Sequence, residues 1–196
     1  LITGIDDDDE FLPHRLSSLY DKYSDEYSFV CSGYIWDYGH KSRERFVNER
    51  KIDLNDILSI NEASNQVLVK TSRLRDIGGF DLNLVSCQDY DLWVRLISKY
   101  GEAFRINLAT YIVHVGHEKG RISNRTNRLL GYMQFFEKHK NLMTEKNITN
   151  QNFLRIVANE EKLTSIGLLH QINAGYPILK LRYFLSSLIL AIKSPA

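Results

Sequence analysis

The stretch LITGIDDDDEFLP at residues 1–13 places four aspartates directly after an apolar, β-branched segment that predicts a short buried strand. Residues 10–23 then predict a helix, with Pro13 near its first turn and Leu16 and Leu19 at helical spacing. Adjacent carboxylates repel one another, so they require open water or a positive charge, and a divalent cation supplies that charge compactly. Acidic runs are commonly solvated loops, but ligand sites of open α/β sheets form where strands end. The run therefore predicts either a solvated loop or a metal or phosphate site.

The rest of the first 122 residues alternates strand and helix patterns, which predicts an α/β fold. Residues 27–50 alternate apolar and polar side chains around a turn and predict a hairpin. The other segments predict a short helix or loop (54–61), a strand (65–70), a short helical turn closed by two glycines (71–81) and one or two strands (102–117).

Residues 84–101 predict the most informative helix of the chain. Its apolar stripe ends at Gly101, a natural stop, and consists of Leu92, Trp93, Leu96, Ile97 and Tyr100. Asp89 points along the middle of this stripe at the first turn, where the helix dipole favours an ionised carboxylate. Asp91 points away, four residues before Arg95, which predicts an ordinary surface ion pair. Asp89 is therefore either a helix cap or an acid that projects into a functional site.

From residue 123 onward the sequence predicts three or four helices without a strand between them. The last helix has an apolar run at residues 183–192, with Lys180, Arg182 and Lys193 around it. This run is shorter than the ~20 residues that a membrane-spanning helix needs. Residues 176–193 therefore either lie in a membrane interface or pack on neighbouring helices.

Composition excludes several classes of function. The net charge of the 196-residue chain is +1, from 25 basic and 24 acidic residues, which does not indicate a nucleic-acid partner. Cys31 and Cys87 are more simply two buried thiols than a disulfide, which favours a reducing, cytoplasmic location. No phosphate-binding loop or Cys-x-x-Cys pair is present. Because the chain begins inside a predicted strand and lacks an initiating Met, we expect an upstream segment to be missing.

Two segments, in the right order and about 80 residues apart, carry a resemblance to the inverting, GT-A-type nucleotide-sugar glycosyltransferases of glycosyltransferase family 2. GIDDDDEFLPHRL resembles the family's Asp-x-Asp strand end with the following helix, and GGFDLNLVSCQDYDLWVRL resembles its catalytic-helix segment. The resemblance covers residues 1–123. It implies a partial, Rossmann-like GT-A mixed sheet over residues 1–122, with the metal and acceptor sides of the site. The helices that the sequence pattern predicts over residues 123–196 form an α-helical extension that is not diagnostic of the family.

The resemblance implies roles for the acidic residues. Asp6 and Asp8 match the Asp-x-Asp pair, with Asp8 as the direct ligand of Mn²⁺ or Mg²⁺ and Asp6 as a second ligand nearer the sugar nucleotide. Asp7 and Asp9 are additional acids, Asp7 on the donor side and Asp9 as support. Asp89 matches the general base that takes the acceptor's proton. We therefore expect Asp8 and Asp89 to stand across a hollow about one hexose wide.

Further ligands of the donor are expected after the last strand. His114 best matches the histidine that completes the metal shell in some members of the family, and His117 is the alternative. Arg121 and Arg125 lie in a segment that resembles the mobile loop over the diphosphate.

On the acceptor side, Gln88 replaces the Glu that often precedes the base in the family, which affects acceptor contacts rather than the base. Tyr34 and Trp36, in GYIWDYG, are candidates for stacking on sugar faces, although packing in the core is the favoured interpretation for both.

The predicted reaction transfers a sugar, with inversion, from a nucleoside-diphosphate-sugar to a hydroxyl of a glycan or lipid-linked acceptor, in bacterial surface polysaccharide synthesis. The family's nucleotide-recognising strands have no counterpart here, so we expect this chain to be inactive alone and to form a homodimer or pair with the missing half. Two alternatives remain: another metal-dependent phosphate enzyme, such as a nucleotidyltransferase or phosphatase, and a non-catalytic scaffold.

Overall fold

The computed structural model describes residues 1–64, 66–115 and 125–193, with side chains described to residue 188, and it divides into two compact units. The first unit comprises residues 1–57, 61–83 and 88–122, and the second comprises residues 58–60, 84–87 and 123–196. Each unit is described by itself.

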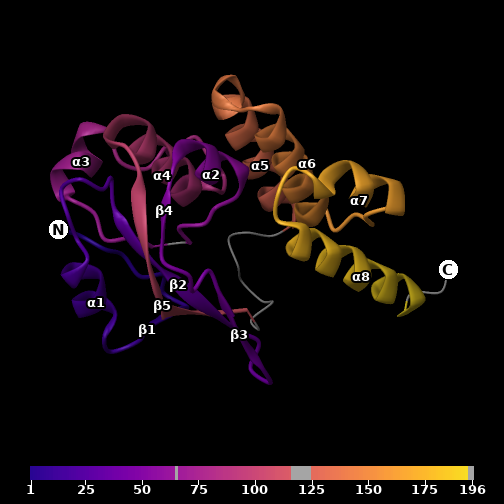
Figure 1. Cartoon of the computed structure of the whole chain (residues 1–196), viewed down its shortest axis with the longest axis horizontal. Coiled ribbons are helices and arrows are strands. Elements are labelled where there is room, and N and C mark those ends of the chain that lie inside the picture. The colour runs from indigo at the N-terminus through magenta and orange to yellow at the C-terminus, as the bar shows by residue number, and fades with distance from the viewer. Residues whose placement is uncertain (65, 116–124, 194–196) are drawn as a thin grey trace. The chain divides into compact units, whose positions relative to one another are not determined.

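The first unit is built on a mixed five-stranded sheet, which confirms the predicted α/β class (Figure 1). The central strand β5 (Ala103–His114) pairs in parallel with β2 (Val30–Asp37) and antiparallel with β1 (Glu10–Phe11) and β4 (Arg50–Ile52). The predicted hairpin is also confirmed, because β2 pairs antiparallel with β3 (Ser42–Arg45). Parallel pairing requires a long crossover, and the helices between β2 and β5 provide it.

Helices α2 (Leu54–Ser59), α3 (Thr71–Asp76) and α4 (Gln88–Tyr100) occupy predicted positions. In α4 the predicted stripe is buried at Leu92, Trp93, Leu96 and Ile97. The Trp93 ring packs 5.5 Å from the Phe29 ring. Gly101 ends the helix at a φ of 88°, which suits glycine and confirms the predicted stop.

The predicted ion pair between Asp91 and Arg95 is present, but it is buried and does not lie on the surface as expected. Asp91 is fully buried and accepts a 2.8 Å hydrogen bond from Arg95 Nε. The Arg95 guanidinium also donates to the carbonyls of Ile77 and Gly79 after α3. These carbonyls belong to a different segment, so the pair joins α4 to the end of α3 and is covered by protein.

The N-terminal segment differs from the predicted buried strand. Ile2 forms one isolated antiparallel bridge with Val69, and the side chains of Leu1, Ile2 and Ile5 are exposed. A single bridge gives no sheet face to cover these side chains. The predicted strand at residues 65–70 likewise consists of isolated bridges, from Val69 to Ile2 and from Leu68 to Val30.

Helix α1 (Arg15–Asp21) buries Leu19 as predicted but leaves Leu16 and Tyr20 exposed. Its other buried residue is Arg15, whose guanidinium donates to the hydroxyls of Ser32 and Thr110 on β2 and β5. The short helix is thus fastened to the sheet by one apolar and one polar side chain.

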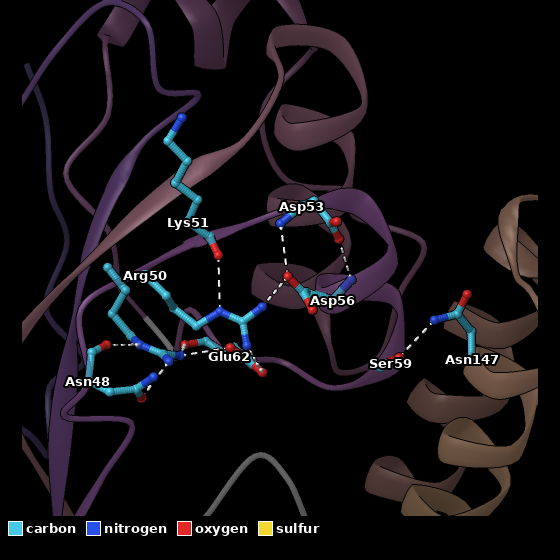
Figure 2. Close-up of polar contacts among 9 residues, drawn as sticks. Asn48, Arg50, Lys51, Asp53, Asp56, Ser59, Glu62 and Asn147 are labelled. Atoms are coloured by element: carbon cyan, nitrogen blue, oxygen red, sulfur yellow. Dashed lines mark hydrogen bonds and ion pairs between the residues drawn. The ribbon is translucent and has the colours of Figure 1, made fainter. Parts of the chain in front are cut away.

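A buried polar cluster anchors the edge of the sheet next to α2 (Figure 2). Arg105 of β5 donates to the Glu62 carboxylate at 2.9 Å and to Asn48 Oδ1 at 2.8 Å. Arg105 and Glu62 are each only 1% exposed. Arg50 of β4 pairs with both Asp56 and Glu62. Because both buried charges have partners, this cluster is a structural brace rather than a reactive site.

The second unit is helical in the part that the structure describes, as predicted for residues 123–196. Its elements are α5 (Arg125–His139), the 3-10 helix η1 (Lys140–Leu142), α6 (Glu145–Ala158), α7 (Ser165–Ile172) and α8 (Pro177–Lys193). Thr144 and Asn147 form a capping box at the start of α6, and Asn147 also donates to the Ser59 hydroxyl (Figure 2). None of the helices in the described residues is long and apolar enough to cross a membrane.

The two cysteines are free thiols, as predicted. Cys31 is buried, and burial raises its pKa to about 12, while Cys87 is half-buried. The surroundings of Cys31 therefore do not activate it as a nucleophile.

Candidate functional site

The acidic run forms a tight turn that is fastened to β5. The Asp9 amide donates to the Asp6 carbonyl at 3.1 Å, which closes the turn. The Asp6 amide donates to the Tyr111 hydroxyl at 3.1 Å, and the His114 amide donates to Asp9 Oδ1 at 3.2 Å. Because Tyr111 is buried in the sheet, the turn is held at both ends by the central strand. The run is therefore not a freely solvated loop.

Asp6 is oriented by an amide from a distant segment. Gln66 Nε2 donates to Asp6 Oδ1 at 2.8 Å, and Arg15 Nη2 donates to the Gln66 carbonyl at 2.8 Å. The absence of a side chain at Gly4 makes this contact possible, because a Cβ there would lie 2.4 Å from Gln66 Oε1. Buried Arg15 thereby fixes the backbone that presents Gln66 to Asp6.

Asp89, the second residue of α4, lies close enough to Asp6 for the two charges to interact. Asp89 is half-buried, and Asn61 Nδ2 approaches its Oδ2 at 3.4 Å. Burial, as the larger cause, and the negative charge of Asp6 together raise the pKa of Asp89 from 3.8 to about 6. Backbone amides at the start of α4 and the Asn61 amide oppose this rise. Two acids that are 83 residues apart in the sequence thus share one electrostatic environment.

The other acids of the turn differ in exposure. Asp7 and Asp8 are exposed, whereas Asp9 is half-buried. Burial raises the pKa of Asp9, hydrogen bonds from Tyr111 and the His114 amide lower it, and the charges of Asp6 and Asp8 raise it. The charge of Asp6 thus acts on both Asp89 and Asp9, and the charge of Asp8 acts on Asp9.

His114 lies between two carboxylates. Its Nε2 is 3.2 Å from Glu10 Oε1, and its Nδ1 is 3.3 Å from Asp37 Oδ2. Both ring nitrogens thus face acids other than Asp6 and Asp8. Within the described residues, no group of three His, Cys, Asp or Glu side chains is arranged to hold a metal ion.

Three other residues were expected to contact the donor or the metal: His117, Arg121 and Arg125. His117 and Arg121 lie outside the described residues. Arg125 is the first residue of α5, and its side chain also lies outside them.

The acceptor-side residues lie on two elements. Gln88 begins α4 beside Asp89 and is half-buried. On β2, Tyr34 is only 8% exposed, with its ring 6.0 Å from the Phe46 ring, so it packs in the core. The half-buried Trp36 ring is covered on one face by the Arg45 guanidinium, 4.6 Å from its centre.

Sequence patterns did not reveal the polar residues that hold these acids, namely Arg15, Asn61, Gln66 and Tyr111. Only Arg15 has a local signal, because it lies on the sheet-facing side of α1, where a charge needs partners. The other three act across 28 to 105 residues of sequence.

Comparison with known proteins finds a similarity to a curated protein that is named as a glycosyl transferase. No family model and no solved structure matches the chain. A curated Escherichia coli (strain K12) protein named "Putative colanic acid biosynthesis glycosyl transferase WcaA" is 32% identical over 149 residues. The match covers 71% of this chain and 52% of the relative, so the chain spans about half the length of the curated relative it matches. The chain is thus similar to part of a protein whose name describes a glycosyl transferase of colanic acid biosynthesis.

Proposed function

We propose that this chain provides the base and metal side of an inverting glycosyltransferase of family 2, with the GT-A architecture, that transfers a sugar from a nucleoside-diphosphate-sugar to an acceptor hydroxyl in polysaccharide biosynthesis. The observation that carries the proposal is the setting of Asp89: burial raises its pKa, Asn61 contacts its carboxylate, and Asp6 lies close enough for its charge to add to the rise. The similarity to a protein named as a glycosyl transferase of colanic acid biosynthesis supports the same class of reaction.

Asp89 is the proposed general base. With a pKa of about 6 it is ionised at neutral pH, yet it is a stronger base than an ordinary aspartate. Asn61 and the backbone amides at the start of α4 orient its carboxylate. Asp89 would take the proton of the acceptor hydroxyl as that oxygen attacks the sugar carbon. In a one-step displacement the diphosphate leaves from the opposite face, which inverts the configuration at that carbon.

Asp6 and Asp8 would hold Mn²⁺ or Mg²⁺. Both offer carboxylate oxygens from one turn, which suits these hard cations. A site of one or two carboxylates completed by substrate phosphates is typical of Mg²⁺, so a cage of three protein ligands is not required. The cation would act as a Lewis acid on the departing diphosphate. His114 is the proposed additional ligand, and it would have to leave Glu10 or Asp37 to serve.

Other residues have proposed supporting roles. Asp7 and the arginines Arg121 and Arg125 would contact the donor. Gln88 and Trp36 would line the acceptor side, whereas the burial of Tyr34 favours a role in the core.

We further propose that the acceptor is a glycan or a lipid-linked glycan, that the enzyme acts in the cytoplasm, and that residues 176–193 contact a membrane. Because the chain spans about half of its relative, we propose that transfer requires a nucleotide-binding segment beyond this chain or a second copy.

The decisive experiment is a transfer assay with a panel of nucleoside-diphosphate-sugars and Mn²⁺, performed on the chain and on a version extended by about 90 upstream residues, in line with the size of a nucleotide-binding half-domain. In the extended protein, Asp89→Asn should reduce turnover by about 10²–10⁴-fold. Asp76→Asn, at an exposed acid, is the matched control and should leave turnover unchanged. Wild-type turnover by the Asp89→Asn variant would refute the proposed base.

A further inference from the structure

Helix α8 has an inverted distribution of side chains. Its buried positions include Lys180, 0% exposed, and Ser187, 5% exposed. Lys180 reaches inward, where its Nζ donates to Asn150 Oδ1 at 2.6 Å and to the Gln171 carbonyl at 2.7 Å. The exposed side instead carries large aliphatic residues with exposures of 44–66%: Ile178, Leu181, Leu185 and Leu188. A surface helix normally turns such residues toward the core.

The four residues form one continuous stripe. At 100° per residue, positions 178, 181, 185 and 188 fall within an arc of about 80° on the helix. Arg182 and Ser186, both exposed, lie beside this stripe on the same side. The outward side of α8 therefore carries an aliphatic stripe with a basic and a polar residue along one flank.

Helix α7 also carries large aliphatic side chains that are exposed. It packs against α8 within the second unit, and the Lys180 bond to the Gln171 carbonyl ties the two helices together. Ile166 and Leu169 of α7 are each 70% exposed. We refer to the six exposed residues as the α7–α8 apolar surface: Ile166, Leu169, Ile178, Leu181, Leu185 and Leu188.

The charge of the chain is divided unequally along the sequence. Residues 123–196 contain ten Lys or Arg and four Asp or Glu, a net charge of +6, although the whole chain carries +1. The first 122 residues therefore carry −5. No acidic residue follows Glu161, while four Lys or Arg do. Such asymmetry between the halves of a chain indicates an anionic partner for the basic half.

We propose that the α7–α8 apolar surface docks on the face of a lipid bilayer that contains anionic headgroups. The aliphatic stripe would enter the boundary between headgroups and acyl chains, and Arg182 beside it, together with the net positive charge of residues 123–196, would meet the negative surface. Because no helix of the described chain can cross a membrane, α8 lies along the bilayer rather than through it. This extends the proposed contact of residues 176–193 to α7 and assigns the face and the lipid charge.

Two other occupants fit the observations less well. A nucleic acid would use the positive charge but not the aliphatic stripe, since bases stack on aromatic rings. A second copy of this chain would cover the stripe but would bring two segments of charge +6 together.

The test is flotation of the 196-residue chain with vesicles of phosphatidylcholine alone and with vesicles containing about one third phosphatidylglycerol. We expect binding to the anionic vesicles, weaker binding to the neutral ones, and weakening by salt. The double variant Leu181→Gln, Leu185→Gln should bind the anionic vesicles at least about tenfold more weakly. The matched control is Leu82→Gln, Leu142→Gln, which replaces two exposed leucines outside the surface and should bind as wild type does.

Several outcomes would overturn the proposal. These are no binding to anionic vesicles, equal binding by the two double variants, a concentration-dependent dimer that only the α8 variant abolishes, or binding to a single-stranded oligonucleotide in preference to vesicles. Circular dichroism of both double variants verifies that the helices are retained. Because no sugar donor is used, failure here leaves the proposed transfer reaction standing.

Discussion

Replacing Asp89 by Asn should stabilise the first unit at neutral pH while it removes the proposed base. The pKa of Asp89 in the folded protein is about 6, against an ordinary value of 3.8. The folded state therefore binds this proton more tightly than the unfolded state does. Its contribution to stability is fully present below about pH 4 and is lost as the pH rises through about 6. A difference of about two pKa units corresponds to about 3 kcal/mol, so at neutral pH we expect the variant to gain about 1–3 kcal/mol.

The assay is urea unfolding of wild type and variant at about pH 7.5 and about pH 4. Tryptophan fluorescence reports on the first unit, because Trp36 and Trp93 both belong to it. The gain should be present at the higher pH and small at the lower one.

The matched control is Asp91→Asn on the same helix. Asp91 is fully buried and paired with Arg95, so this variant should lose about 3–5 kcal/mol. The reasoning is refuted if Asp89→Asn is no more stable than wild type at the higher pH, or if its gain is equal at both. Either result would mean that burial and the Asp6 charge do not destabilise the ionised Asp89 carboxylate in the folded state.

Three further variants test the packing. Glu62→Gln leaves the buried Arg105 guanidinium without its carboxylate and should lower the free energy of unfolding in urea by about 3–5 kcal/mol. A loss below about 1 kcal/mol would show that the Arg105–Glu62 pair does not brace the fold. Gly33→Ala places a Cβ 2.6 Å from the Arg45 carbonyl across the hairpin and should cost about 1–3 kcal/mol, measured in the same way, whereas an unchanged midpoint would argue against this close approach. Burial lowers the pKa of Lys180 to about 8, so the second unit should gain thermal stability, followed by circular dichroism, as the pH rises through 8; Lys180→Met should abolish this gain, and an identical pH dependence in both would exclude the lysine as its cause.

Local patterns predicted those features that depend on neighbours in the sequence. The 3.6-residue period placed α4 and its buried stripe, and Gly101 marked its end. The alternation of residues 27–50 predicted the β2–β3 hairpin, and the change of pattern at residue 123 predicted the helices that follow.

Features that depend on distant partners were not accessible in this way. Asp91 has the spacing of a surface pair, but the carbonyls of Ile77 and Gly79 draw Arg95 inward and cover it. The apolar segment 1–5 has the composition of a buried strand, but only one bridge pairs it. Burial is a property of the neighbouring segment as much as of the residue itself.

In the candidate site, too, local features were predicted from the sequence and contacts with distant partners were not. The sequence predicted that the acidic turn and the start of α4 belong together, and the structure brings Asp6 into the electrostatic environment of Asp89. It did not predict that Gln66 and Tyr111 would fasten the turn, because these contacts join segments 60 and 105 residues apart. The charge of Asp8 raises the pKa of Asp9, and its expected placement opposite Asp89 stays a prediction.

The proximity of Asp6 and Asp89 is tested most directly by titrating the Asp89 carboxyl carbon with nuclear magnetic resonance in wild type and in Asp6→Asn. We expect a midpoint near pH 6 in the wild type and a lower midpoint in the variant, because the Asp6 charge raises the pKa of Asp89. A midpoint near the ordinary value of 3.8 that is unmoved by Asp6→Asn would mean that the two acids do not share a site.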